Sequence, residues 1–239
     1  MQDIEYQKMY QLEANHWWFV SKRKFIKTVL KEKKFSKILD IGCGTGKNIE
    51  MLSRYGQAWG LDNSKIALSF CRQRGLTNLK LGLAEKLPFK SNNFDLVTIF
   101  DVLYHQGIKN DLEVLKEIHR VLRSDGQLII TDCSYQWLYG PHDKVMQARQ
   151  RYSRRELITK VKQVGFSVQK ASYIFMFTFP IFLINRLINK YLHFNNQSDV
   201  KPFPRLINNL FIKLTLVESK LLKYINLPFG SSIIISAIK

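Results

Sequence analysis

A glycine-rich turn is the part of this sequence whose residue types and spacing best suit ligand chemistry. The apolar segment Ile38–Ile41 carries one carboxylate, Asp40, and leads into Gly42, Cys43, Gly44, Thr45 and Gly46. Glycine permits backbone angles that other residues rarely adopt and lets a ligand approach the main chain closely. The spacing is G-x-G-x-G, which differs from the G-x-G-x-x-G fingerprint of dinucleotide-binding turns. We therefore expect a buried strand, a tight ligand-binding turn, and a helix whose N-terminus near Lys47 favours an anionic group.

A second carboxylate follows the next predicted strand. Asp62 lies at the carboxyl end of Ala58–Leu61, where an acidic side chain can accept hydrogen bonds from both hydroxyl groups of a ribose. Asn63 and Ser64 come next and precede a predicted helix, so capping of that helix is an alternative role for this region. We expect Asp62 and Asn63 to lie beside a ligand bound at the glycine turn.

Two histidines are candidates for proton transfer. Asp101, Tyr104 and His105 follow the fourth predicted strand, at the sheet edge where open α/β sheets bind ligands. His142 and Asp143 are neighbours in a predicted loop region. A neutral imidazole near its ordinary pKa could take a proton from a hydroxyl group as a general base. A packing role for His105, and a hydrogen-bonded loop pair for His142 and Asp143, are the alternatives.

Strand and helix patterns alternate along the chain and predict an α/β fold. The predicted strands are residues 38–41, 58–61, 79–83, 93–100, 127–131, 166–173 and 232–238. The predicted helices between them are residues 48–55, 65–74, 111–123 and 153–164, and residues 132–152 are predicted to be a loop region. Residues 5–35 also show helical spacing of apolar residues, interrupted by an aromatic cluster at 15–19.

The ordered motifs resemble those of the class I S-adenosylmethionine (SAM)-dependent methyltransferases, in particular the type 11-like group. Residues 38–46 resemble motif I of that family, and LKEIHRVLRSDGQLII (115–130) resembles its LxEixRVLkPGGxlxi segment. The resemblance implies a Rossmann-like seven-stranded sheet, N-terminal helices that cover the cofactor, and SAM as methyl donor. It implies that SAM contacts Asp40, Gly42, Cys43, Gly44, Gly46, Asp62, Asn63, Ala84, Glu85, Asp101 and Val102.

One position departs from the family pattern. The family has an acidic residue that contacts the adenine amino group where this chain has Leu83. The resemblance then implies that backbone groups of Ala84 and Glu85, together with apolar contacts, hold the adenine ring.

The N-terminal aromatic segment resembles that of bacterial members of the family with an HWWF sequence. His16–Phe19 and Arg23 match it, and aromatic packing of a helix on the domain is the alternative interpretation. We expect the methyl acceptor to contact Trp17, Arg23, Tyr104, Arg151 and Tyr152.

These motifs divide the chain into four parts. Residues 1–37 form the helical lid, 38–173 the SAM-binding core, 174–231 a helical acceptor-binding insertion, and 232–239 the final strand of the core. The insertion opens with 11 uncharged residues, 174–184, fewer than the roughly 20 that span a bilayer. It either contacts a membrane interface, with Arg186 and Lys190 at the headgroups, or forms a buried cap over the acceptor.

Charge is concentrated in the second half of the chain. The formal net charge is +18, of which residues 1–140 carry +6 and residues 141–239 carry +12. Such a surface suits phospholipid, a phosphorylated substrate or nucleic acid, or is simply solvated. The absence of a (D/N)PP(Y/F) motif after the fourth strand argues against methylation of nucleic-acid amino groups.

The remaining features set the functional class and compartment. The acidic N-terminus does not resemble a signal peptide, and three scattered cysteines predict a reducing cytoplasm without a metal site. We expect methyl transfer, by O-methylation, to a small, lipid-linked or glycan-type acceptor, with the protein cytoplasmic and peripheral at the inner membrane face. The alternatives are an RNA methyltransferase and a non-catalytic SAM-binding scaffold, the latter because of Leu83 and the lack of an unambiguous base.

Overall fold

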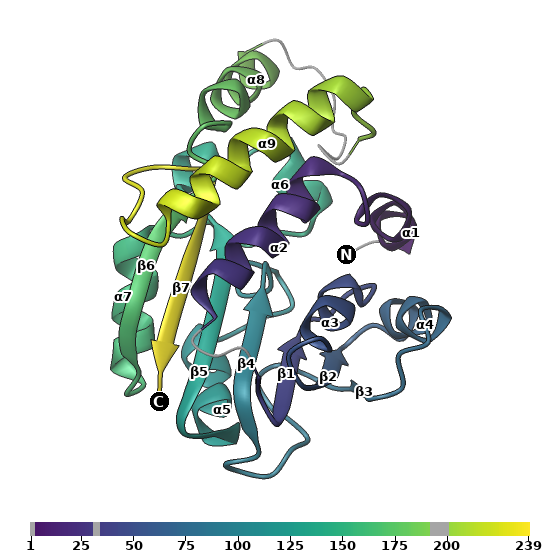
Figure 1. The fold of residues 1–239 in the computed structure, drawn as a ribbon, viewed down its shortest axis with the longest axis vertical. Coiled ribbons are helices and arrows are strands. Elements are labelled where there is room, and N and C mark those ends of the chain that lie inside the picture. The colour runs from purple at the N-terminus through teal and green to yellow at the C-terminus, as the bar shows by residue number, and fades with distance from the viewer. Residues whose placement is uncertain (1–2, 31–33, 192–200) are drawn as a thin grey trace.

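The computed structural model describes residues 3–30, 34–191 and 201–239, and a seven-stranded sheet lies at its centre (Figure 1). The strands are β1 (Lys37–Ile41), β2 (Gln57–Asp62), β3 (Leu79–Leu81), β4 (Phe94–Phe100), β5 (Leu122–Cys133), β6 (Ser167–Ile174) and β7 (Ser232–Ile238). Their order across the sheet is β3-β2-β1-β4-β5-β7-β6. Strand β7 runs antiparallel to β5 and β6, whereas the other pairs are parallel. The predicted Rossmann-like α/β architecture, with its last strand at 232–238, is confirmed.

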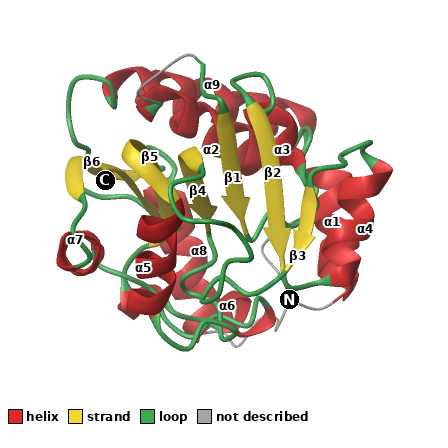
Figure 2. Cartoon of the chain, turned by 90° about the horizontal axis from the view of Figure 1, so that it is seen from below, coloured by secondary structure: helices red, strands yellow, loops and turns green. Residues whose placement is uncertain are grey.

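Helices cover both faces of the sheet. They are α1 (Asp3–Leu12), α2 (Trp17–Val29), α3 (Lys47–Leu52), α4 (Lys65–Gln73), α5 (Asp111–Val121), α6 (Pro141–Val145), α7 (Arg154–Gln163), α8 (Phe179–Tyr191) and α9 (Arg205–Leu221). Figure 2 shows α5 and α7 on one face of the sheet, with α2, α3 and α9 on the other. The middle strand β4 has almost no exposed side chains because both of its faces are covered, which explains its uninterrupted apolar sequence.

Several boundaries differ from the sequence prediction. The helical N-terminal region is two helices, because His16 adopts an extended conformation and its side chain accepts a hydrogen bond from Trp18 N to start α2. Strand β5 spans 122–133, longer than predicted, because Leu122 already pairs with Phe94 of β4. The register shifts between this pair and Gln127, and Asp125 within the shift has a φ of 62°. The predicted loop 132–152 contains α6 and a 3-10 helix at Gln136–Leu138. Ile174, predicted as the first residue of the insertion, is the last of β6, and Lys37, assigned to the lid, begins β1.

The N-terminal helix α2 and the insertion helix α9 pack side by side, as Figure 1 shows, and form one layer, the α2–α9 cap. Ser21 and Thr215 share a hydrogen bond of 2.5 Å between their hydroxyl groups. Trp17 N donates to Asn208 Oδ1 at 2.8 Å, and Glu218 accepts from Met176 N at 2.8 Å. The predicted lid and the predicted insertion, far apart in sequence, are therefore joined.

The four phenylalanines at the start of the insertion divide between interior and surface. Phe175 and Phe179 are buried, Phe182 is half-buried, and Phe177 is 39% exposed. A simple buried cap would enclose all four, so neither alternative for this segment describes it alone. Lys190, predicted to lie at lipid headgroups, has a side chain outside the described residues. No helix in the described ranges is both long and apolar enough to cross a membrane.

Candidate active site

One cavity of about 810 Å³ extends from the glycine turn to the insertion. Its walls come from the carboxyl ends of β1, β2 and β4, from α1 and α2, and from α6 and α8. The predicted site residues that line it are Trp17, Gly42, Cys43, Gly44, Asp62, Asn63, Ala84, Glu85, Asp101, Val102, Tyr104, His105, His142 and Arg151. The fold thus brings together, around one space, most of the positions that the motifs predicted.

The glycine turn has a backbone that only glycine adopts without strain. Gly42, Gly44 and Gly46 have φ values of 67°, 54° and 88°, in the left-handed region. A Cβ atom at Gly42 would lie 2.2 Å from Val102 Cγ2, so the turn also packs directly on the loop after β4. This arrangement leaves the main chain of the turn open to a ligand.

Asp62 holds the turn from the neighbouring strand. Its Oδ2 accepts a hydrogen bond from Gly44 N and its Oδ1 accepts one from Ser64 N, both at 2.9 Å. Burial raises the pKa of this carboxyl group. Asp62 also lines the cavity. Its hydrogen bond with Ser64 N, at the start of α4, is therefore compatible with the predicted ligand contact.

Asp40 lies beneath the turn with part of its carboxyl group unsatisfied. Its Oδ1 accepts a hydrogen bond from Thr98 Oγ1 at 2.7 Å, whereas Oδ2 is buried without a hydrogen-bond partner among the described residues. Burial raises the pKa of Asp40 to about 7. A buried, incompletely paired carboxylate favours a nearby cation. The turn and the Asp62 carboxylate line the cavity and fit the ribose of SAM. Asp40 lies outside the cavity lining, but its ionised form beneath the turn adds a negative charge that suits the ammonium and sulfonium groups of SAM.

The side of the cavity predicted to hold adenine has an apolar residue at its entrance. Leu83 lines it and is 54% exposed, followed by the nearly buried Ala84. Glu85 Oε1 accepts a hydrogen bond from Lys109 N at 2.9 Å, which ties this segment to the loop before α5. The departure from the family pattern at position 83 therefore leaves no acidic side chain at that point.

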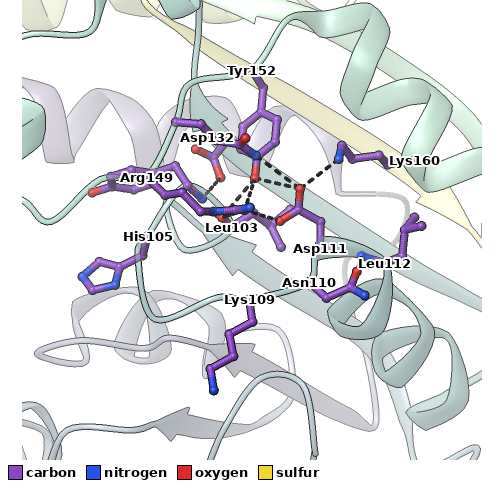
Figure 3. A network of polar contacts seen from close by, with 12 residues as sticks. Leu103, His105, Lys109, Asn110, Asp111, Leu112, Asp132, Arg149, Tyr152 and Lys160 are labelled. Carbon is purple, nitrogen blue, oxygen red and sulfur yellow. Dashed lines mark hydrogen bonds and ion pairs between the residues drawn. The ribbon is translucent and has the colours of Figure 1, made fainter.

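Two residues predicted to bind the acceptor do not line the cavity. The Arg23 guanidinium donates to Glu13 O at 2.6 Å and so braces the end of α1. The Tyr152 hydroxyl is buried and donates to Leu103 O at 3.0 Å and Asp111 Oδ2 at 3.1 Å (Figure 3). The polar groups of both residues bond to other elements of the fold, so the structure gives no support to the acceptor contacts predicted for them. Of the predicted cofactor contacts, Asp40 and Gly46 also lie outside the cavity lining.

The His142–Asp143 pair is not a catalytic dyad in this geometry. Asp143 Oδ1 accepts from Arg151 Nε at 2.9 Å, and its Oδ2 accepts from Gly140 N at 2.8 Å and lies 3.7 Å from Arg186 Nη2. Both oxygens are thereby engaged, and Asp143 is 1% exposed. It anchors Arg151 and the start of α6, which in turn places His142 at the cavity wall.

His105 has an environment that suits hydrogen bonding better than proton abstraction. Burial lowers its pKa to about 4. Its Nδ1 accepts a hydrogen bond from Gly107 N at 3.1 Å, which assigns the proton of the neutral ring to Nε2. His142 is therefore the better candidate for a base.

A buried ion pair at the cavity was not predicted from the sequence. Lys22 of α2 pairs with Asp101, and its Nζ lies 3.7 Å from the centre of the Trp18 ring. Asp132, behind Asp101, has a pKa raised well above its ordinary range by burial and by the Asp101 charge. The pair links the α2–α9 cap to the end of β4. The sequence shows only that Lys22 is one of several basic residues after the HWWF segment, and this does not identify a partner.

Comparisons with known proteins identify a methyltransferase domain in this chain. Residues 39–130 match a family described as a methyltransferase domain. An uncharacterized protein of Methanocaldococcus jannaschii is 29% identical over 84% of this chain and 84% of its own length. A demethylmenaquinone methyltransferase of Staphylococcus epidermidis is 38% identical over 47% of this chain, which spans only 49% of that relative.

Solved structures show the same fold at low sequence identity. A putative methyltransferase of Haloferax volcanii, solved in complex with the Trm112 methyltransferase activator, aligns with a TM-score of 0.64, 18% identity and coverage of 99% of this chain and 93% of that one. A SAM-dependent methyltransferase of Thermotoga maritima, described as a possible histamine N-methyltransferase, aligns with a TM-score of 0.62 and 18% identity over 98% and 95% of the two chains.

This fold is that of the Rossmann-like class I methyltransferases, and the matched domain is a methyltransferase domain. Residues 39–130 carry a methyltransferase domain, so the protein is a SAM-dependent methyltransferase, and SAM is its methyl donor. This is the class that motif I and the segment 115–130 predicted.

The titration of Asp40 leads to a prediction for SAM binding. The folded-state pKa, about 7, is above the ordinary value of 3.8, so in the free protein ionisation of Asp40 lowers stability as pH rises between these values. A cationic ligand favours the ionised form. We expect SAM affinity to rise about tenfold from about pH 6 to pH 8, with proton release on binding at the acidic end. Calorimetry in buffers of different ionisation enthalpy measures both, and Asp40→Asn should flatten the profile; a wild-type profile that is already flat would contradict this assignment.

Proposed function

We propose that the methyl acceptor is a small, lipid-linked or glycan-type molecule and that the methyl group is transferred to an oxygen atom. The observation that carries the proposal is the continuity of the cavity. Beyond the glycine turn it is walled by aromatic side chains, among them Trp17, Phe182 and Phe211, and by the cations Arg151 and Arg186. Aromatic walls bind apolar or sugar-like faces, and guanidinium groups suit phosphate or carboxylate.

The residues of this chain supply alignment and proton transfer. SAM, when bound, supplies a methyl group that is already activated on sulfonium, so positioning of the acceptor is much of the catalytic task. Trp17 Nε1 is buried in the cavity wall without a hydrogen-bond partner among the described residues, and it would donate to an acceptor oxygen. His142, at the same cavity, would take the hydroxyl proton.

The setting of the protein supports this class of acceptor. The three cysteines are free, in keeping with a reducing cytoplasm. The exposed cations of the insertion lie among exposed apolar side chains, a combination that suits lipid headgroups and acyl chains better than a nucleic-acid backbone. Demethylmenaquinone, the acceptor in the name of several relatives, is one defined compound to test.

The proposal is tested by offering the full chain labelled SAM with bacterial lipid extract, glycan extract, demethylmenaquinone or RNA in parallel. We expect label in the lipid or glycan fraction, on an oxygen atom as located by fragmentation mass spectrometry. Trp17→Phe, which removes the indole donor, should lower the rate, while Trp59→Phe, away from the cavity, should not. Label that appears only in RNA would overturn the proposed acceptor class, and label on nitrogen or on carbon would overturn transfer to oxygen, in each case without affecting SAM binding.

A further inference from the structure

The outer faces of α8 and α9 carry exposed apolar side chains in helical rows. On α8 these are Ile181, Ile184, Leu187 and Ile188, and on α9 they are Leu206, Ile207, Leu210, Leu216, Val217 and Leu221. Leu206 is the extreme case, with 85% of its surface exposed. Both helices contribute residues to the lining of the cavity. A monomeric soluble protein rarely exposes so many large apolar residues around one cavity unless they contact a partner or a lipid phase. We call this surface the α8–α9 face.

The charge of this face is of one sign. Exposed cations accompany the apolar rows: Lys201, Arg205, Lys213, Lys220 and Lys223. The one carboxylate between residues 201 and 231, Glu218, is buried and bonded to the backbone of Met176 and Phe177. Apolar rows flanked by lysine and arginine match the surface of an interfacial helix, whose apolar side enters the acyl boundary while its cations meet anionic headgroups. A second copy of the chain would bring like charges together on this face.

The cavity reaches the surface within the α8–α9 face. Ile181 of α8 and Phe203, in the segment before α9, both line the cavity and are 53% and 38% exposed. Phe203 packs edge-on against Trp17, with 6.3 Å between ring centres, so this edge adjoins the aromatic wall of the acceptor section. The cations Arg186 and Arg151 lie deeper in the same cavity and are nearly buried.

We propose that the α8–α9 face docks on an anionic lipid bilayer and that the acceptor enters the cavity from the bilayer between Ile181 and Phe203. An amphiphile that enters there leaves its apolar part against the aromatic wall and in the acyl region, with its polar end towards the interior cations. The docking follows from the surface itself. The route of entry rests on the proposed function, since it requires an acceptor with an apolar part.

Docking is measured by co-sedimentation of the full chain with vesicles of phosphatidylcholine and phosphatidylglycerol. We expect binding at low salt, little binding to pure phosphatidylcholine, and loss of binding at about 1 M salt, where the screening length is about 3 Å. The double variant Leu206→Ser, Leu210→Ser should lower partitioning by about tenfold or more, because both leucines are exposed and neither lines the cavity. Lys213→Gln should lower it by about fivefold.

The matched control is Leu81→Ser, an equally drastic change at a leucine that is 50% exposed on the edge strand β3. It should bind vesicles like the wild type, and all variants should keep wild-type SAM affinity, which shows that they fold. Wild-type protein that stays in the supernatant with anionic vesicles at low salt would overturn the docking. So would vesicle binding unchanged by the double serine variant, or a wild-type dimer that this variant makes monomeric.

The route of entry has a separate test. A cysteine at Ile181→Cys should react with a water-soluble maleimide in solution and react at least about fivefold more slowly on anionic vesicles. A cysteine at Leu81→Cys should react at the same rate in both. Equal protection at both positions, or none at 181 while the protein is bound, would overturn entry at this point. Because these readouts need no methyl transfer, their failure is distinguishable from failure of the proposed acceptor.

Discussion

Replacing His142 with alanine is expected to lower the rate of methyl transfer by roughly 10²–10⁴-fold, the usual contribution of a general base. The imidazole lies at the cavity wall, on the short helix that the Arg151–Asp143 ion pair holds in place. Among the described residues, two other histidines line the cavity, and each has Nδ1 engaged with the backbone: His105 accepts from Gly107 N, and His16 accepts from Trp18 N at the start of α2. The rate is measured with labelled SAM and the lipid or glycan fraction that takes up the label.

The control for this prediction is His105→Ala, which should change the rate by much less than His142→Ala. Both variants should bind SAM with wild-type affinity in calorimetry, since neither histidine touches the glycine turn. If His142→Ala retains full activity, the reaction needs no histidine base, and alignment of donor and acceptor carries it.

Replacing Asp143 with alanine is expected to lower the free energy of unfolding by about 3–5 kcal/mol, because it leaves an arginine charge buried without compensation. Asp143 and Arg151 are 1% and 5% exposed, and Asp143 Oδ1 lies 2.8 Å from Arg151 Nη2 and 2.9 Å from Arg151 Nε. The change also removes the acceptor for Gly140 N at the start of α6. Urea unfolding followed by circular dichroism measures the loss.

Two controls separate the buried charge from general effects of substitution. The double variant Asp143→Ala, Arg151→Met should recover a large part of the stability, because the uncompensated charge is gone. Glu117→Ala breaks the surface pair with Arg120 and should cost no more than about 1 kcal/mol. A loss below about 1 kcal/mol in the Asp143 single variant would show that Arg151 is solvated or otherwise compensated.

Local sequence was sufficient for the parts of the molecule whose geometry is set by neighbouring residues. Gly42, Gly44 and Gly46 adopt left-handed backbone angles that their residue type alone permits without strain, so the turn was readable from spacing. The position of Asp62 was predicted because it ends an apolar run, and that run marks a strand. The terminal strand β7 has the bounds predicted for it, because Ser232–Ile238 is a short run rich in isoleucine, which favours a buried strand.

Only the tertiary structure decided which distant residues meet. Lys22 reaches Asp101, and Asp143 takes Arg151 in preference to its neighbour His142, because the packing of α2 and α6 fixes those directions. Tyr152 looks like a binding residue in a basic segment but turns inward to Asp111, a contact between residues 41 positions apart. A side chain's partner depends on the elements that pack around it, and sequence spacing carries that information only within one element.

The insertion shows most clearly what the sequence determines and what only the tertiary structure decides. Its sequence determined that apolar aromatic residues and cations occur together, and its length excluded a simple bilayer span. The sequence did not determine which of Phe175, Phe177 and Phe179 face inward. That depends on the end of β6, the start of α8 and the hydrogen bonds that Glu218 accepts from the backbone N–H groups between them. In the folded protein Phe175 and Phe179 are buried, whereas Phe177 and the outer rows of α8 and α9 are exposed. The same segment therefore covers the cavity on one side and presents an apolar surface on the other.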